Sequence, residues 1–476
     1  MAKSDFRTAA LIRELRARRA AGARELYEAL GMSQASFSRL VSQSPDEVLT
    51  LGRGRATRYA LPRAISGVER DIPLFEVDEQ GVAHRVGTIN PLHGGETWVA
   101  RGASGELYEG LPYFLDDMCP QGFLGRAFAM ANRDLELPER VTDWNDDHML
   151  RALSARGEDT VGNLLIGEGS LQRFLSAAGP LTPIRLADQS LAFNHLAVLA
   201  VQGQPAGSSA GGEHPKFAAY VEHGSGKRAH VLVKFSPPLN SEVGERWSDL
   251  LACEAIAADV LHEAGIPAAR ARILTNQERT HLVVPRFDRL GRRGRRGVVS
   301  LGALDDYHFG RRDNYTAASV RLERAGLISA GDAETIRLVH TFGMLIANSD
   351  MHFGNISFFT HADGRLELTP VYDMLPMLYA PVNDQVLERE FVIASLPAQT
   401  MASWEPAFRA ARRFWERVLA HPRISKGFKS RVRGNADKVA RLYAASRASI
   451  NAGSMLRTST RQETAARARG RRRAGV

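Results

Sequence analysis

Residues 342–373 alternate apolar runs with two short polar stretches, a pattern that predicts strands with polar groups at their ends. The first stretch follows the apolar run 342–347 and holds Asp350 and Asn355. The second holds Asp373 and follows a strand-like segment at 366–372. A further strand is expected at 356–359. A hairpin of these two strands would bring its two ends, with Asn355 and Asp373, over one metal ion.

These residue types suit phosphoryl transfer. Asp350 can orient the proton of an attacking hydroxyl, whereas Asn355 and Asp373 offer the hard oxygen ligands that Mg²⁺ prefers beside phosphate oxygens. Polar loops often contain Asp and Asn without such a role. The spacing by itself therefore favours neither a phosphoryl-transfer site nor an ordinary polar loop. His352, inside the same loop, is interpreted as a hydrogen-bonding residue of the nucleotide site rather than as a zinc ligand.

A Ser/Gly-rich turn at 208–216 provides the context for that loop. Adjacent glycines allow backbone N–H groups to approach phosphate closely. The phosphate-binding candidates of this turn are Ser209, Ala210, Gly211 and Gly212. A strand at 230–235 then places Lys234 within reach of ATP phosphates, and Glu254, in the helical pattern 250–264, is expected to pair with it. The sequence contains no G-x-x-x-x-G-K-[ST] motif, which disfavours a P-loop NTPase.

Together these motifs resemble the HipA-like serine/threonine kinases of toxin–antitoxin systems. The resemblance runs in the right order over roughly residues 70–450. It rests on the segments 111–122, 157–162, 209–216, 234–235, 286–289, 348–355 and 371–373. It implies an α+β, bilobal, protein-kinase-like fold with a small β-rich N-terminal subdomain, and it implies ATP and Mg²⁺ as cofactors.

The resemblance also implies roles for individual residues. Lys234 would hold ATP phosphates, Asp350 would be the catalytic Asp, and Asn355 and Asp373 would bind Mg²⁺. Ser209 would be an autophosphorylated serine whose modification inactivates the enzyme.

Two details qualify those roles. Ser208 is an alternative acceptor for the phosphoryl group, and both serines could instead only satisfy turn hydrogen bonds. Many family members carry Lys immediately before the metal-binding Asn, and here that position is Gly354. The absence of this positive charge is expected to affect the rate of turnover more than the type of reaction.

Composition and charge bound the class of protein. A chain of 476 residues with 44% hydrophobic composition can bury more than one core. Its two cysteines, Cys119 and Cys253, predict a reducing compartment without disulfides. The start lacks the apolar core of a signal peptide, and no stretch is long enough to span a membrane, so a cytoplasmic protein with no membrane partner is expected.

The net charge of +9 is concentrated at the two ends. Residues 1–65 carry 12 Lys and Arg against 6 Asp and Glu, and residues 457–476 carry 7 Arg against one Glu. Each end is therefore +6, which leaves the remainder of the chain near −3. This distribution indicates a discrete polyanion-binding element rather than a uniformly basic enzyme.

The sequence pattern of residues 1–65 is consistent with such a polyanion-binding element. Helices are predicted at 24–30, ended by Gly31, and at 34–41, capped by Ser33. Segment 48–61 then reads as a two-stranded wing with an arginine-rich tip, so a winged helix-turn-helix that binds double-stranded DNA is expected. The DNA-contact candidates are Gln34, Ser36, Arg39, Arg53, Arg55 and Arg58. The alternative is a small protein-interaction domain with a solvated basic face. Fusion of such a module to a HipA-like kinase resembles the YjjJ-like subgroup.

Three further segments complete the domain plan. Short strands are expected at 72–77, 82–89 and 97–101. The Arg-rich insert 289–296 is interpreted as a flexible hairpin tip, a solvated loop in preference to a contact with nucleic acid or an acidic substrate. The tail after about residue 455 should be disordered. Five domains are predicted. They are the winged helix-turn-helix (1–65), the β-rich N-terminal subdomain (66–125), the kinase N-lobe with the phosphate-binding turn (126–285), the helical kinase C-lobe with the catalytic and metal-binding residues (286–455) and the basic tail (456–476).

The leading hypothesis is an ATP-dependent protein serine/threonine kinase, toxin-like, able to autophosphorylate and fused to a DNA-binding module. One alternative is a DNA-binding transcriptional regulator with a kinase-like sensing domain. Another is a small-molecule phosphotransferase. The resemblance implies a protein substrate, which in characterised relatives is an aminoacyl-tRNA synthetase, with other translation factors as further candidates, and it implies an antitoxin partner.

Overall fold

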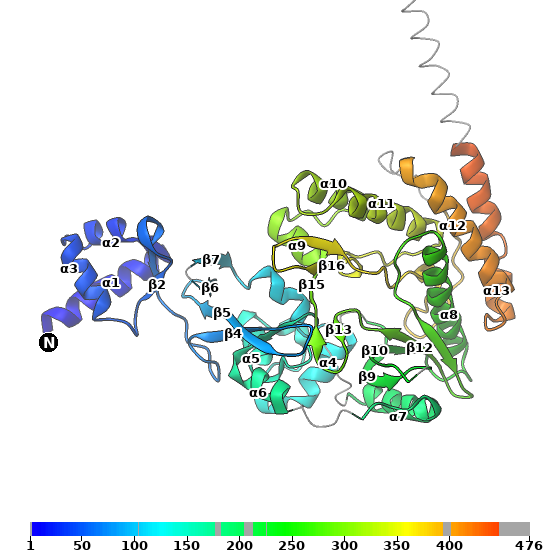
Figure 1. Cartoon of the computed structure of the whole chain (residues 1–476), viewed down its shortest axis with the longest axis horizontal. Coiled ribbons are helices and arrows are strands. Elements are labelled where there is room, and N and C mark those ends of the chain that lie inside the picture. The colour runs from blue at the N-terminus through cyan, green and yellow to red at the C-terminus, as the bar shows by residue number, and fades with distance from the viewer. Residues whose placement is uncertain are drawn as a thin grey trace, which may run out of the picture. The chain divides into compact units, whose positions relative to one another are not determined.

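The computed structural model of the chain describes residues 2–102, 104–176, 182–203, 213–224, 226–393 and 401–446 (Figure 1). Contacts divide the chain into two compact units. The first comprises residues 1–235, 274–312 and 353–369, and the second comprises residues 236–273, 313–352 and 370–476. The five-domain division stays a prediction, and the basic tail lies outside the described residues.

The N-terminal segment of the first unit combines three helices with a small sheet of strand order β1-β3-β2. The predicted helix pair is confirmed: Gly31 has φ +58°, and the Ser33 side chain accepts the N–H of Ser36 at 3.3 Å. The helix α1 and the strand β1 were not predicted. The elements are α1 (Ala2–Arg18), β1 (Ala20–Gly22), α2 (Ala23–Ala29), α3 (Gln34–Ser42), β2 (Leu49–Leu51) and β3 (Arg58–Ala60).

The core of this segment draws on both helices and strands. Leu11 and Leu15 of α1 are fully buried with Leu26 and Phe37. A second apolar cluster joins Leu51 and Ala60 to Leu92, with the indole of Trp98 against it. The backbone continues the contact, because the N–H of His93 donates to the carbonyl of Leu61 at 2.8 Å. The small sheet is therefore packed on the sheet that follows it in the chain.

The next sheet is antiparallel, with strand order β7-β6-β5-β4-β8. It confirms the three predicted strands and adds β7 and β8. Its inner face packs Ile72 and Ile89 against Leu150 and Leu153 of α5. The elements are β4 (Ile72–Val77), β5 (Ala83–Pro91), β6 (Glu96–Arg101), β7 (Ser104–Glu109), α4 (Gly122–Ala131), α5 (Asp146–Arg156), β8 (Leu164–Ile166) and α6 (Gly167–Ser176).

A four-stranded sheet of order β11-β12-β10-β9 carries the predicted lysine. The helix α7 covers it, and Phe193 and Ala197 of α7 share a core with Phe217 and Phe235. The strand predicted at 230–235 is confirmed. The elements are α7 (Gln189–Val201), β9 (Lys216–Glu222), β10 (Arg228–Phe235), β11 (Arg272–Thr275) and β12 (Thr280–Pro285).

Two small sheets follow. The predicted hairpin is confirmed: β16 and β17 pair antiparallel with Phe358 opposite Leu368, and β15 extends them into a three-stranded sheet. The strands β13 and β14 form a separate two-stranded hairpin. The elements are β13 (Arg289–Leu290), β14 (Gly294–Arg295), β15 (Gly297–Ser300), α9 (Leu301–His308), β16 (Ser357–Thr360) and β17 (Leu366–Leu368).

The second unit is helical. Helix α11 lies against α10 and α12, and the indole N–H of Trp415 donates to the carbonyl of Leu345 at 3.0 Å. The helices are α8 (Glu242–Glu263), α10 (Tyr315–Arg324), α11 (Ala330–Leu345), α12 (Met401–Ala420) and α13 (Lys426–Val432). No helix within the described ranges is long and apolar enough to cross a bilayer. Cys119 and Cys253 are both buried and free, as predicted.

Candidate active site

The second unit brings two of the predicted acidic residues together through one buried amide. Asn348 lies in the turn that follows α11 and is only 5% exposed. Its side-chain oxygen accepts the backbone N–H of Asp350 at 3.0 Å, and its side-chain nitrogen donates to the carbonyl of Asp373 at 3.4 Å. The loop that carries Asp350 is thus connected to the loop that carries Asp373.

Both loops hold a residue in the left-handed backbone region. Asp373 has φ +58°, which Asp tolerates, whereas Ala347 has φ +61°, which is unfavourable for a residue other than Gly, Asn or Asp. Such conformations persist only where the surrounding structure imposes them, and they concentrate at functional sites. Here the carbonyl of Ala347 accepts the N–H of Leu378 at 3.0 Å.

The two acidic residues differ in exposure. Asp350 is exposed and Asp373 is partly buried. An exposed carboxylate is accessible to a substrate hydroxyl, whereas a partly buried one is better held for a metal ion. His352 is exposed in the same loop, and Glu254 is buried on α8, in the same unit.

The first unit contains the predicted lysine and the predicted amide ligand. Lys234 is 6% exposed near the end of β10 and lies directly opposite Lys216 of β9, which is 2% exposed. The register of the β9–β10 hairpin therefore places two buried lysines opposite each other. Asn355 is buried in the 3₁₀ turn Phe353–Asn355, immediately before β16.

Lys216 was not among the residues predicted to bind ATP. The sequence shows it only as the end of the Ser/Gly-rich turn, and its position opposite Lys234 follows from the register of the β9–β10 hairpin. The serines and glycines of that turn, Ser208, Ser209, Ala210, Gly211 and Gly212, lie outside the described residues.

The predicted DNA-contact residues lie on α3 and on the β2–β3 hairpin. Gln34, Arg39, Arg53 and Arg55 are exposed. Ser36 is only partly exposed, and its hydroxyl lies 3.0 Å from that of Ser33. Arg58 is exposed as well, but its guanidinium donates to the carbonyl of Ala20.

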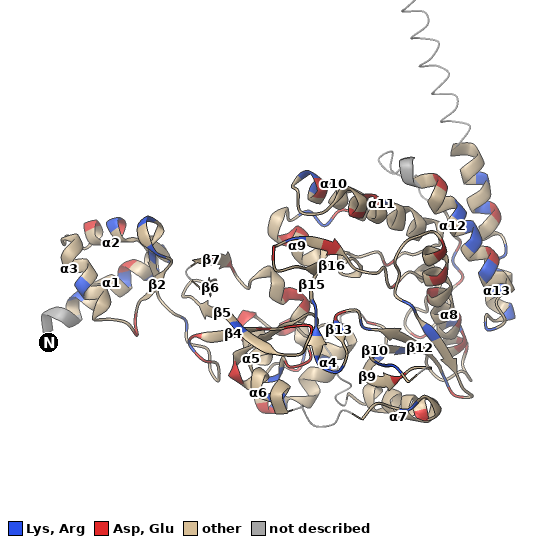
Figure 2. Ribbon diagram, viewed as in Figure 1, with Lys and Arg blue, Asp and Glu red and all other residues tan. Residues whose placement is uncertain are grey.

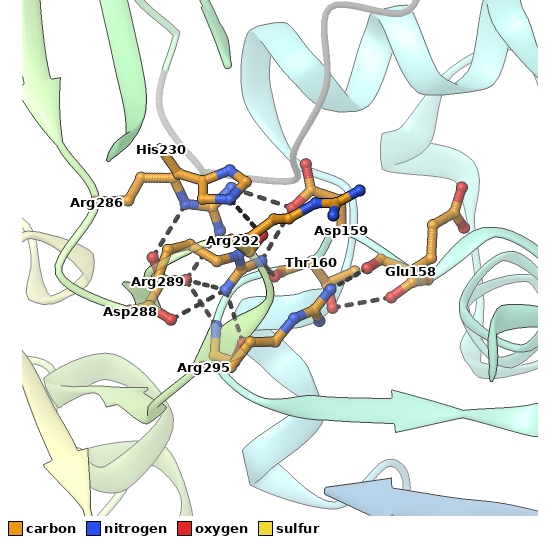
Figure 3. Close-up of polar contacts among 11 residues, drawn as sticks. Glu158, Asp159, Thr160, His230, Arg286, Asp288, Arg289, Arg292 and Arg295 are labelled. Atoms are coloured by element: carbon orange, nitrogen blue, oxygen red, sulfur yellow. Dashed lines mark hydrogen bonds and ion pairs between the residues drawn. The ribbon is translucent and has the colours of Figure 1, made fainter. Parts of the chain in front are cut away.

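The Arg-rich insert 289–296 is only partly solvated, which corrects the prediction: Gly291 and Arg292 at its turn are exposed, but arginines of its two strands are buried in an ion-pair network (Figure 3). Arg289 is 8% exposed and Arg295 is 5% exposed. Arg289 pairs with Asp288 at 2.7 Å and with Asp159 at 3.0 Å, and Arg286 joins the same two carboxylates at 2.8 and 3.3 Å. The network therefore joins the segment 157–162 to the β13–β14 hairpin.

Two further arginines of the insert also have partners in the first unit. The guanidinium carbon of Arg293 lies 4.2 Å from the ring centre of Phe174, and Arg296 pairs with Glu79 at 2.9 Å. Gly294 allows the close approach, because a Cβ there would lie 2.0 Å from the carbonyl oxygen of Glu79. Most arginines of the insert therefore contribute to contacts within the fold.

Asp288→Asn is expected to destabilise the first unit by about 3 kcal/mol, because it leaves Asp159 as the one carboxylate shown to pair with the two buried guanidinium groups of Arg286 and Arg289. Burial by itself would raise the pKa of Asp288, but Arg286 and Arg289 outweigh it and hold that pKa well below its ordinary value. The stabilisation is therefore present above the unfolded pKa, about 3.9, and is lost as pH falls through the lower folded value.

Urea denaturation at pH 7 would measure the change in the free energy of unfolding. Glu79→Gln is the matched control, since it breaks the exposed pair with Arg296 and should cost less than about 1 kcal/mol. Equal effects of the two substitutions would contradict a stabilising role for the buried network.

Comparisons with known proteins agree with this organisation. The family model described as "YjjJ-like toxin, middle domain" matches residues 68–175, and that described as "HipA-like C-terminal domain" matches residues 208–441. Toxin YjjJ of Escherichia coli (strain K12) is 38% identical over 434 residues, which cover 88% of this chain and 96% of that protein.

Two solved structures are also similar. HipA of Shewanella oneidensis MR-1, determined with HipB and operator DNA, aligns with a TM-score of 0.50 and 17% identity over 77% of this chain and 95% of that chain. At this identity the similarity shows a shared fold. The Helicobacter pylori proinflammatory kinase CtkA aligns with a TM-score of 0.37 and 12% identity over 48% of this chain and 88% of that chain.

Proposed function

The chain belongs to the family of YjjJ-like toxins with a HipA-like C-terminal domain, and on that premise we propose that it is an ATP-dependent protein serine/threonine kinase. The observation that carries the proposal is the buried amide of Asn348, which contacts the loops of both Asp350 and Asp373. Phosphoryl transfer requires one carboxylate that acts on the substrate hydroxyl and one that binds the metal ion, and this contact links the loops that carry the two candidates.

In this proposal Asp350 accepts or orients the proton of the substrate hydroxyl, because it is the exposed carboxylate of the pair. Asp373 and Asn355 would hold Mg²⁺ through a carboxylate and an amide oxygen. This donor set fits, since Mg²⁺ usually binds one or two carboxylates and keeps waters and phosphate oxygens as its other ligands. When bound, Mg²⁺ would neutralise charge on the phosphates.

No group of three or more His, Cys, Asp or Glu side chains within the described ranges is arranged to hold a metal ion. A site completed by nucleotide phosphates needs no such group. Lys234 and Lys216 would contribute positive charge to the phosphates from the paired strands β10 and β9. Gly354, where many relatives carry Lys, removes one further charge, so a slow turnover is expected.

We further propose that residues 1–65 form a winged helix-turn-helix that binds double-stranded DNA. The support is the α2–α3 helix pair, the β2–β3 hairpin and the exposed Arg39, Arg53 and Arg55. The Shewanella protein was determined with HipB and operator DNA, which supports including DNA and an antitoxin among the proposed partners.

Autophosphorylation of Ser209 is the most accessible test of the kinase proposal. A phosphoserine in a turn that binds nucleotide phosphates would add about −1.5 to −2 of charge at that place and would oppose rebinding of ATP. Ser209→Ala is expected to keep ATP binding and to lose most self-labelling with [γ-³²P]ATP. Ser209→Asp should mimic the inactive form incompletely, because its charge is smaller.

Ser208→Ala is the matched control and should retain most of the label. Peptide mapping by mass spectrometry then identifies the acceptor. Phosphate found on neither Ser208 nor Ser209 would refute this switch even if the kinase assignment survived.

A further inference from the structure

A buried tyrosine contacts the loop that carries Asp350. Tyr315 is the first residue of α10 and is only 1% exposed. Its hydroxyl donates to the backbone carbonyl of His352 at 2.8 Å. The start of α10 is itself fixed, because the side chain of Asn314 accepts the N–H of Ala317 at 3.0 Å. The hydroxyl is therefore presented by a rigid element rather than by a loop.

This contact lies close in the chain to the contact made by Asn348. The side chain of Asn348 holds the loop at Asp350 itself, by accepting its backbone N–H. Tyr315 holds the loop two residues later, at the carbonyl of His352. The segment from Asp350 to His352 is too short to move independently of both contacts. Both side chains therefore restrain the backbone that carries the Asp350 carboxylate.

From this geometry we propose that Tyr315 is a positioning residue, whose hydrogen bond to the His352 carbonyl keeps the Asp350 carboxylate in place for phosphoryl transfer. The inference rests on the proposed kinase function. Tyr315 does not need to touch the substrate, since its effect passes through the loop backbone. Displacement of a catalytic group by about 1 Å can reduce the rate on the order of 100-fold.

The electrostatic surroundings keep the phenol in its donor form. Burial raises the pKa of Tyr315 above its ordinary value, and the neighbouring Tyr372, Asp373 and Asp350 raise it further. The hydroxyl therefore stays protonated and continues to donate at any working pH.

The next residue on α10 offers a matched control. Thr316 is also 1% exposed, and its hydroxyl lies 2.7 Å from the ring nitrogen Nδ1 of His340 on α11. Thr316→Val removes one buried hydroxyl from the same helix, as Tyr315→Phe does, but the lost hydrogen bond leads to α11 rather than to the catalytic loop. General destabilisation should therefore be similar in the two variants.

The kinetic test compares Tyr315→Phe and Thr316→Val with the unaltered full-length chain in autophosphorylation. Tyr315→Phe is expected to lower kcat about 10- to 100-fold with KM for ATP changed by less than about twofold, because Asp350 is displaced while the nucleotide contacts remain. Thr316→Val should keep kcat within about threefold. Thermal denaturation should give similar midpoints for the two variants.

Hydrogen exchange of peptides that span residues 346–352 provides a second test that needs no activity. Faster exchange in Tyr315→Phe than in Thr316→Val supports the proposal, and equal exchange overturns it. Equal kcat values, a change confined to KM, or failure of Tyr315→Phe alone to fold would also overturn it. If the unaltered chain transfers no phosphate, the kinase proposal fails separately, and hydrogen exchange still decides the role of Tyr315.

Discussion

Asp350→Asn is expected to reduce phosphoryl transfer by roughly 10²- to 10⁴-fold while leaving the chain folded. The substitution keeps the shape of the side chain and removes the carboxylate that orients the substrate proton. Asp350 is exposed, and its loop is held by backbone contacts to Asn348 and Tyr315 that the substitution leaves in place. Autophosphorylation with [γ-³²P]ATP measures the loss, and thermal denaturation checks the fold.

Asp373→Asn should remove transfer as well, for a different reason. It replaces a charged metal ligand with a neutral one, so it should also weaken the affinity for ATP in the presence of Mg²⁺. Asp350→Asn should leave that affinity almost unchanged, which makes the two variants controls for each other in a nucleotide titration. Wild-type autophosphorylation in both would refute the assignment of the site.

Removal of residues 1–65 is expected to abolish binding to duplex DNA and to spare kinase activity. The truncation also uncovers Leu92 and Trp98, which pack against the removed sheet, so point variants are the cleaner test. Arg53, Arg55 and Arg58 changed together to Ala should weaken binding across unrelated sequences. Each lost phosphate contact should reduce the slope of log K against log salt concentration by about 0.9.

Arg24→Ala is the matched control for this experiment. Arg24 is exposed in the same segment but pairs with Glu28 at 2.8 Å, so its loss should change DNA affinity much less. Fluorescence anisotropy with a labelled duplex at several salt concentrations gives both affinity and slope. An unchanged slope in the triple variant would exclude the β2–β3 hairpin as the phosphate-binding element.

If the truncated chain binds DNA as tightly as the full chain, other basic segments are responsible. Residues 401–446 carry 11 Lys and Arg against 3 Asp and Glu, and Figure 2 shows basic residues along α12 and α13. The charge count over the whole middle of the chain hides this basic segment, because it averages residues 401–446 with the acidic residues before them.

Local sequence signals predicted those elements whose determinants lie close together in the chain. The helix pair around Gly31 and Ser33 and the β16–β17 hairpin were predicted because capping residues, turns and alternation are local. The strand β8 was not predicted, because it is a three-residue strand, Leu164–Ile166, that pairs with the distant β4. Its strand character depends on that partner.

Dependence on distant partners also explains why the prediction for the Arg-rich insert was wrong. A run of arginines predicts an exposed loop when its partners are unknown. Arg289 and Arg295 are buried because Glu158, Asp159 and Thr160, more than a hundred positions earlier, supply their hydrogen-bond acceptors. The motifs 157–162 and 286–289 were both recognised in the sequence, but their contact with each other was not predictable from either.

Transfer of phosphate from ATP to a protein tests the kinase proposal most directly. Purified full-length chain and its Asp350→Asn variant would each be incubated with [γ-³²P]ATP, Mg²⁺ and a cell extract, and labelled species would be identified by mass spectrometry. The account predicts phosphoserine or phosphothreonine on a protein of the extract, dependent on Mg²⁺ and absent with Asp350→Asn. Label found only on a small molecule, or equal protein labelling by the variant, would contradict it.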